Sequence, residues 1–308
     1  MSEQQGRKIA IVGASGNIGG LTLNALREKG IHTITAVARA GSSATFPSDV
    51  IVKKGDYSDE SFLVSAFQGQ DVVVLQLSFD SFMAGQAPLI RAAAKAGVKW
   101  VLPTEFGSDL APSKLLDASP LVAGKKQFRD LIEELGMSWV AIINNPWFDW
   151  SLAQGFWGID IKNRSAKLFD GGKTKFITTT LGTTAKGTAG VLSLLESEPE
   201  ALRNKPVYLK SFHISQRDML DSILRATGTE EKDWKVEVLD AAAVVADCEE
   251  KFKQGDHLAM LTGFYVNHMR EGWGGDYNAK AFDIAKLGVA EENLDEVVKR
   301  VVKEVEGQ

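Results

Sequence analysis

Runs of apolar residues alternate with amphipathic segments through the first half of the chain. Each run is short, rich in Val, Ile and Leu, and apolar at almost every position. Such runs are typical of strands buried on both faces of a parallel sheet. The predicted strands are 8–12, 33–38, 50–53, 71–75, 99–102 and 139–143, and the predicted helices between them are 21–29, 59–67, 86–96 and 121–135. Six strands alternating with helices predict a doubly wound parallel α/β sheet.

The pattern becomes less regular after residue 144. The predicted strands there are 175–180, 207–209 and 234–238, and the predicted helices are 184–195, 215–226, 240–253 and 293–305. The sequence shows no internal repeat, linker or low-complexity tract. We therefore expect residues 1–150 to form the sheet domain. Residues 151–308 should form mainly a smaller α+β lobe, with segments that pack back on that domain.

A glycine-rich turn joins the first predicted strand to the first predicted helix. It reads Gly13-Ala14-Ser15-Gly16-Asn17-Ile18-Gly19. Gly13 permits a tight turn, Gly16 lets the backbone approach a pyrophosphate, and Gly19 lets helix and strand pack closely. The helix N-terminus adds free N–H groups and a partial positive charge. An ordinary turn of small residues is the alternative, but the position favours a dinucleotide site of the Rossmann type.

The end of the second predicted strand indicates which dinucleotide is bound. Sites specific for NAD place a carboxylate there for the ribose 2′-hydroxyl, but this chain has Arg39 and no carboxylate before Asp49. Arginine pairs with a 2′-phosphate that a carboxylate would repel. We therefore predict NADP(H), with hydrogen bonds from Ser42 and Ser43. The alternative for Arg39 is a solvated surface charge.

Other cofactor contacts are expected where further strands end, because ligands of such sheets bind at the carboxyl ends of the strands. Leu77 and Ser78 should lie beside the ribose and pyrophosphate, and we place Thr104, Asn145 and Pro146 at the cofactor too. Asp56 either accepts a hydrogen bond from the adenine amino group or caps the following helix.

Composition narrows the class of protein. The net charge of −5 argues against a general nucleic-acid binder, and a single cysteine, Cys248, rules out an internal disulfide and a cysteine-based zinc site. The polar start lacks the apolar core of a signal peptide, and no apolar stretch approaches 18 residues. We expect a cytoplasmic protein without membrane or nucleic-acid partners, a monomer or homodimer.

Large aromatic residues cluster just beyond the sixth predicted strand. Trp147, Phe148, Trp150 and Trp157 either line an apolar substrate pocket or form the core of the second lobe. We assign them, with Phe106, to substrate binding.

Several common chemistries are missing from the sequence. No tyrosine is followed by a lysine four positions on, although Tyr277 and Lys280 are one residue short of that spacing. Gly-x-Ser-x-Gly is absent, and the four histidines show no metal-ligand spacing.

Two motifs instead resemble those of a known family. They are Pro103-Thr104-Glu105-Phe106-Gly107 and the run Lys125-(x3)-Arg129-(x2)-Ile132-Glu133-(x2)-Gly136. Together they resemble the isoflavone reductase and phenylcoumaran benzylic ether reductase group, atypical short-chain reductases of the NmrA-like family. The stretch from Asn144 to Trp150 looks more like fungal NmrA-like proteins.

The resemblance implies that Lys125 is the catalytic residue. It would reach the nicotinamide ribose of the cofactor and the reacting oxygen of the substrate, and donate a proton or stabilise negative charge during hydride transfer. Its neighbour Lys126 is the competing candidate. Plant relatives carry a second basic residue after the arginine that this chain lacks, so Lys53 or Lys54 substitutes for it, or Arg39 and the serines act alone. The expected function is an NADPH-dependent reductase of a bulky aromatic or polycyclic small molecule. The alternative is an NADP(H)-sensing regulatory protein without turnover.

Overall fold

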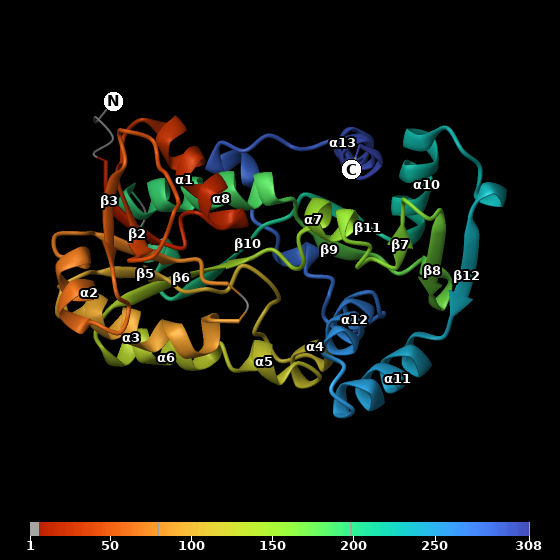
Figure 1. The fold of residues 1–308 in the computed structure, drawn as a ribbon, viewed down its shortest axis with the longest axis horizontal. Helices are drawn as coiled ribbons and strands as arrows, with labels where there is room; N and C mark the ends of the chain where they lie inside the picture. The colour runs from red at the N-terminus through yellow and green to blue at the C-terminus, as the bar shows by residue number, and fades with distance from the viewer. Residues whose placement is uncertain (1–5, 79, 198, 308) are drawn as a thin grey trace.

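The computed structural model describes residues 6–78, 80–197 and 199–307, and its largest element is a seven-stranded sheet (Figure 1). Every pair of neighbouring strands is parallel, in the order β10-β6-β5-β4-β1-β2-β3. The strands are β1 (Lys8–Val12), β2 (Thr33–Arg39), β3 (Ile51–Gly55), β4 (Val72–Leu75), β5 (Trp100–Leu102), β6 (Ser138–Ile143) and β10 (Lys205–Tyr208). This confirms the predicted doubly wound parallel sheet. The strand order reverses between β1 and β4, because the chain crosses back from β3 to β4, and ligands of such folds bind at that point.

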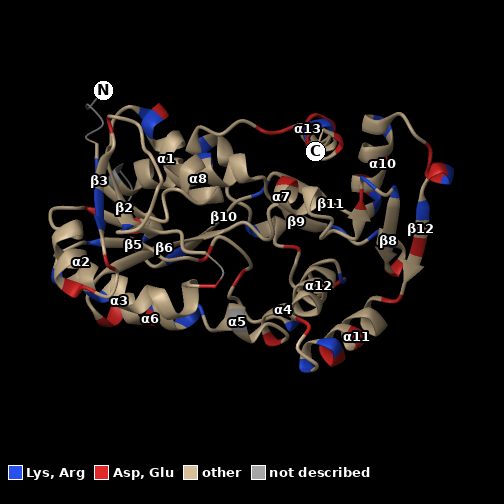
Figure 2. Ribbon diagram, viewed as in Figure 1, with Lys and Arg blue, Asp and Glu red and all other residues tan. Residues whose placement is uncertain are grey.

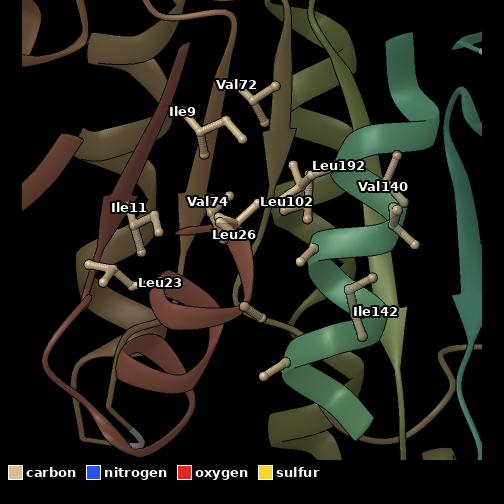
Figure 3. Packing of buried hydrophobic residues seen from close by; sticks show 14 of the residues in the cluster. Ile9, Ile11, Leu23, Leu26, Val72, Val74, Leu102, Val140, Ile142 and Leu192 are labelled. Carbon is tan, nitrogen blue, oxygen red and sulfur yellow. The ribbon is translucent and has the colours of Figure 1, made fainter. Parts of the chain in front are cut away.

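Helices cover both faces of the sheet, because successive side chains of a strand point to opposite faces. Ile9 and Ile11 of β1 pack in the cluster that includes Leu23 and Leu26 (Figure 3). Ala10 and Val12 pack in the cluster on the other face. The first face is covered by α1 (Asn17–Lys29) and α8 (Leu181–Ser197), and the second by α2 (Glu60–Phe67), α3 (Phe82–Lys95) and α6 (Lys126–Glu134). Burial of one such side chain contributes ~1.5–3 kcal/mol.

Most of the second half forms a lobe with its own hydrophobic core. It contains a three-stranded sheet and a two-stranded one, seen on the right and at the centre of Figure 1. Its strands are β7 (Ile159–Asp160), β8 (Ser165–Phe169), β12 (Lys235–Leu239), β9 (Phe176–Thr178) and β11 (Phe212–Ile214). Its main helices are α7 (Phe148–Ala153), α10 (Gln216–Thr227), α11 (Ala241–Lys253), α12 (His257–His268) and α13 (Leu294–Glu306). The remaining pieces are α4 (Lys114–Asp117), α5 (Pro120–Ala123), α9 (Pro199–Leu202), η1 (Asp170–Gly172), η2 (Glu231–Asp233), η3 (Asn278–Lys280) and η4 (Ile284–Leu287).

Some predicted elements were wrong in extent. The helix expected over 121–135 is two helices, α5 and α6, with Lys125 at the N-cap of α6. The helix expected from 86 begins one turn earlier, at Phe82. The predicted strand at 207–209 is β10, which joins the central sheet beside β6. Helix α8, also from the second half, packs against α1. Strands β7, β8 and β11 and helices α7 and α12 were not predicted.

Charged residues of both signs are scattered over the strands, helices and loops of both halves (Figure 2). Within the described residues, no helix combines the length and the apolar character needed to cross a bilayer.

Candidate cofactor and active site

The turn between β1 and α1 has the geometry of an anion-binding site. Gly13 has φ +87°, and a Cβ there would lie 2.1 Å from the Gln76 carbonyl oxygen. A Cβ on Gly19 would lie 1.9 Å from the Gly13 carbonyl oxygen. Gly16 is the N-cap of α1 and offers no side-chain acceptor, so the first N–H groups of the helix are left for a ligand. Ser15 and Asn17 are exposed at this turn, whereas Ile18 is buried in the core.

Strand β2 pairs in parallel with β1, so the loop after β2 lies next to the glycine-rich turn after β1. Arg39 ends β2 and is exposed, and among the described residues its guanidinium forms no ion pair. The Ser42 N–H donates to the Arg39 carbonyl (2.9 Å), which turns the loop. Lys54 Nζ donates to the Ser42 carbonyl (2.8 Å), whereas Lys53 Nζ donates to the Ser65 carbonyl (2.9 Å) on α2. Of the two lysines, Lys54 is the one at the loop.

Further predicted contacts follow β3, at one edge of the sheet, and the neighbouring strands β4 and β5. Asp56 is exposed and accepts from the Ser58 N–H (2.8 Å). The cap of α2 is Asp59, so the capping alternative for Asp56 was wrong. Thr104 Oγ1 donates to the Leu75 carbonyl (3.0 Å) and accepts from the Leu77 N–H (3.3 Å), which ties the ends of β4 and β5 together. Ser78 is exposed, and its hydroxyl contacts that of Ser81.

The loop after β5 is held from both halves of the chain. The Gly107 carbonyl accepts from the N–H groups of Asn144 and Asn145, both at 3.0 Å. Asn145 is buried, with φ +54°, and its Nδ2 donates to the carbonyls of Ile177 (2.9 Å) and Gly275 (2.8 Å). Phe106 is buried at φ +33°. Asn145 thus joins the end of β6 to β9 and to the loop before η3, while Pro146 is buried and its carbonyl accepts from Thr178 Oγ1.

Lys125 points at this loop. Its Nζ donates to the Glu105 carbonyl (2.6 Å) and lies 5.1 Å from the centre of the Phe82 ring. A Cβ on Gly107 would be 3.7 Å from the same nitrogen. Burial lowers the pKa of Lys125 to about 8. Lys126 instead is exposed and paired with Asp130 (2.6 Å), so the two candidate lysines have distinct environments.

A buried ion pair lies under Lys125. Arg129 donates from Nε and Nη2 to the two carboxylate oxygens of Glu105, and the Glu105 side chain is 1% exposed. The Arg129 guanidinium lies 4.4 Å over the Trp139 ring, whose Nε1 donates to Glu133 (2.7 Å). Our prediction assigned no role to Glu105, Arg129 or Phe82. The available signal for Glu105 was a carboxylate three residues after an apolar strand, within the motif Pro103-Thr104-Glu105-Phe106-Gly107.

The aromatic residues after β6 divide between surface and core. Trp157 and Phe148 are fully buried in the core of the second lobe, which corrects their assignment to the substrate pocket. Trp147 and Trp150 are half-buried, with ring centres 6.2 Å apart, and Phe156 lies 5.5 Å from Trp150. The Trp147 Nε1 is buried without an acceptor in the described part of the chain.

Tyr277 and Lys280, which are one residue short of the Tyr-x-x-x-Lys spacing, form contacts within the fold. The Tyr277 hydroxyl donates to the Leu209 carbonyl (2.7 Å), and Lys280 pairs with Asp109 (2.8 Å). Among residues 6–78, 80–197 and 199–307, no cluster of His, Cys, Asp and Glu is arranged to hold a metal ion. A surface cavity of about 540 Å³ lies between Lys175, His213 and the loop from Arg270, and includes none of the predicted site residues.

Comparison with known proteins agrees with this geometry. The profile of the NmrA-like family matches residues 5–164. The oxidoreductase aprR of Aspergillus flavus is 32% identical over 307 residues, which covers 96% of this chain and 99% of aprR. Two solved structures each cover 96% of this chain and 99% of their own. They are AtPrR2 with NADP+ and (+)pinoresinol (21% identical, TM-score 0.76) and isoflavone reductase (20% identical, TM-score 0.78). The profile match over half of the chain and the full-length similarity to aprR confirm the resemblance seen in the motifs, and the chain belongs to the NmrA-like family.

Proposed function

We propose that this protein is an NADPH-dependent reductase of a bulky aromatic small molecule, with Lys125 as its proton donor. The observation that carries the proposal is the position of the Lys125 ammonium, 2.6 Å from the Glu105 carbonyl in the loop after β5, where burial also lowers its pKa to about 8. A group that titrates near neutrality is suited to acid–base catalysis. The oxidoreductase name of aprR and the NADP+ in the AtPrR2 structure support the same reading.

The residues present fit a dinucleotide phosphate. The closeness of Gly13 and Gly19 to neighbouring backbone leaves no room for a Cβ, and the uncapped N-terminus of α1 faces the same turn. Arg39 is the residue expected to hold the 2′-phosphate. When bound, the cofactor supplies the hydride.

The chain's own residues orient the substrate and move the proton. Lys125 Nζ rests on the Glu105 carbonyl and donates its proton to the oxygen of the substrate that gains negative charge. Trp147 is the N-cap of α7 and Trp150 lies within that helix, shortly after Asn145, and their half-buried rings offer an apolar wall for a planar substrate. The Trp147 Nε1 offers this wall one hydrogen-bond donor.

The test is NADPH oxidation against a panel of aromatic ketones, lactones, ethers and quinones. Lys125→Met should lower kcat by roughly 10²–10⁴-fold, the usual contribution of a general acid, without loss of NADPH binding. Lys126→Met is the matched control and should behave as wild type, because Lys126 is exposed and paired with Asp130. Equal activity of Lys125→Met and wild type would refute the assignment. Binding of NADPH with no turnover of any panel member would favour the sensing role instead.

The pH profile supplies an independent measure. A lysine that donates a proton must be protonated, so the rate should fall as the pH rises through about 8. If a residually active Lys125→Met variant shows the same fall in rate at high pH as wild type, that fall comes from the titration of another group.

A further inference from the structure

Glu105 receives two cations from one face of α6. Lys125 and Arg129 are four residues apart and so project from the same side of the helix. Lys125 donates to the backbone carbonyl of Glu105, and Arg129 donates to both oxygens of its carboxylate. Glu105 therefore binds both cations, Lys125 through its backbone carbonyl and Arg129 through its carboxylate.

Arg129 is held firmly in that arrangement. Its side chain is 13% exposed and stacks on Trp139, which Glu133 holds in turn by a hydrogen bond. The two-pronged contact of a guanidinium with a carboxylate occupies both oxygens along their plane. Both carboxylate oxygens of Glu105 therefore already accept a hydrogen bond from Arg129.

We propose that Arg129 is a positioning residue for Lys125: by occupying the Glu105 carboxylate it keeps the lysine on the neutral carbonyl, from which the ammonium can reach a substrate. If Arg129 were absent, the buried carboxylate would have Lys125 as its nearest cation. Lys125 would then form the ion pair itself and leave the position for proton transfer. The inference rests on the proposed function, in which Lys125 is the proton donor.

The electrostatics of the site agree with this division. Burial lowers the pKa of Lys125, the Glu105 carboxylate raises it, and Arg129 lowers it. These two are the charged groups that act on the ammonium, from the loop after β5 and from α6, while α3 contributes only the uncharged ring of Phe82. Loss of Arg129 and loss of the Glu105 charge should therefore shift the pKa of Lys125 in opposite directions.

The experiment measures the pKa of Lys125 without any substrate. Wild type and variants are labelled with a trace of acetic anhydride between pH 6 and 11, and acetylation of Lys125 is followed by peptide mass spectrometry. Arg129→Gln should make Lys125 at least tenfold less reactive at pH 8, because its pKa rises. Glu105→Gln should make it more reactive at that pH. Asp130→Asn is the matched control, since it removes a carboxylate of α6 that pairs with Lys126, and it should leave Lys125 unchanged.

Two more variants keep the test decisive if Arg129→Gln does not fold. Arg129→Lys keeps the charge but cannot hold both carboxylate oxygens, so the drop in Lys125 reactivity should be smaller than in Arg129→Gln. The double variant Glu105→Gln/Arg129→Gln removes both charges together, and it should lack the drop in reactivity expected of Arg129→Gln. Shifts of the same sign in the two single variants, or no shift in either, would overturn the proposal.

Turnover separates this inference from the proposed function. If the enzyme reduces a panel substrate, Arg129→Gln should lower kcat and move the high-pH limb upward while the KM for NADPH stays within about twofold. If wild type reduces none, the proposed function fails, yet the opposite shifts in labelling still establish that Arg129 keeps Glu105 from Lys125.

Discussion

Replacement of Gly19 by alanine tests whether the turn after β1 depends on close packing against the helix. An alanine Cβ would lie 1.9 Å from the Gly13 carbonyl oxygen and 2.8 Å from its carbonyl carbon. These are backbone atoms of the phosphate turn, so the turn or the helix must move by at least about 1 Å. Overpacking of this kind costs ~1–3 kcal/mol.

Gly20→Ala is the matched control for this change. Its Cβ would lie 3.7 Å from the Ala14 carbonyl oxygen, an ordinary contact. Both variants gain ~1 kcal/mol of helix propensity, so the difference between them isolates the cost of the close contact. At about 2 °C per kcal/mol for a chain of this size, Gly19→Ala should melt ~2–6 °C below Gly20→Ala.

Cofactor binding should follow the same order. Because the displaced turn carries the N–H groups predicted to bind the pyrophosphate, Gly19→Ala should weaken NADPH binding by about tenfold or more, measured by titration calorimetry. Gly20→Ala should bind as wild type does. Equal melting temperatures and equal affinities in the two variants would refute this account of the turn.

Two further variants test the 2′-phosphate site and the acid stability. Arg39→Ala should weaken NADPH binding by roughly ten- to hundredfold and leave NADH binding unchanged, as expected for the loss of hydrogen bonds to a charged group. Lys53→Ala is the control, because the Lys53 ammonium binds a carbonyl of α2 and not the loop after β2. Burial lowers the pKa of His268 to about 4, so its contribution to stability is fully present above pH 6.5 and is lost as the pH falls through 4. His268→Gln should remove up to ~3 kcal/mol of that acid sensitivity in denaturant titrations, whereas replacement of the exposed His257 should not; an acid limb as steep as wild type would contradict the role of His268.

Sequence was informative where a feature depends on neighbours along the chain. The strand at 8–12, the turn from Gly13 to Gly19 and the helix ending at Gly30 follow from apolar periodicity and from conformations that only glycine adopts readily. The basic end of β2 is equally local. For this reason the sheet was predictable, and the candidate cofactor site could be outlined from the sequence.

Tertiary contacts decided the features that join distant segments. Strand β10 pairs with β6, about 65 residues earlier, and nothing within the apolar run at 205–208 indicates which sheet it enters. Trp157 and Trp150 look alike in sequence, yet one is fully buried and the other is half-buried, because packing of the second lobe covers only the first. The pair of Glu105 and Arg129 bridges 24 residues.

Lys125 depends on both local sequence and tertiary contacts. Its position in the chain, one helical turn before Arg129, is a property of the sequence. What lowers its pKa is the burial that the loop after β5 and helices α3 and α6 create together. Charge type and helical spacing are local, whereas desolvation and the choice of acceptor depend on which segments meet, and only the folded chain brings those segments together.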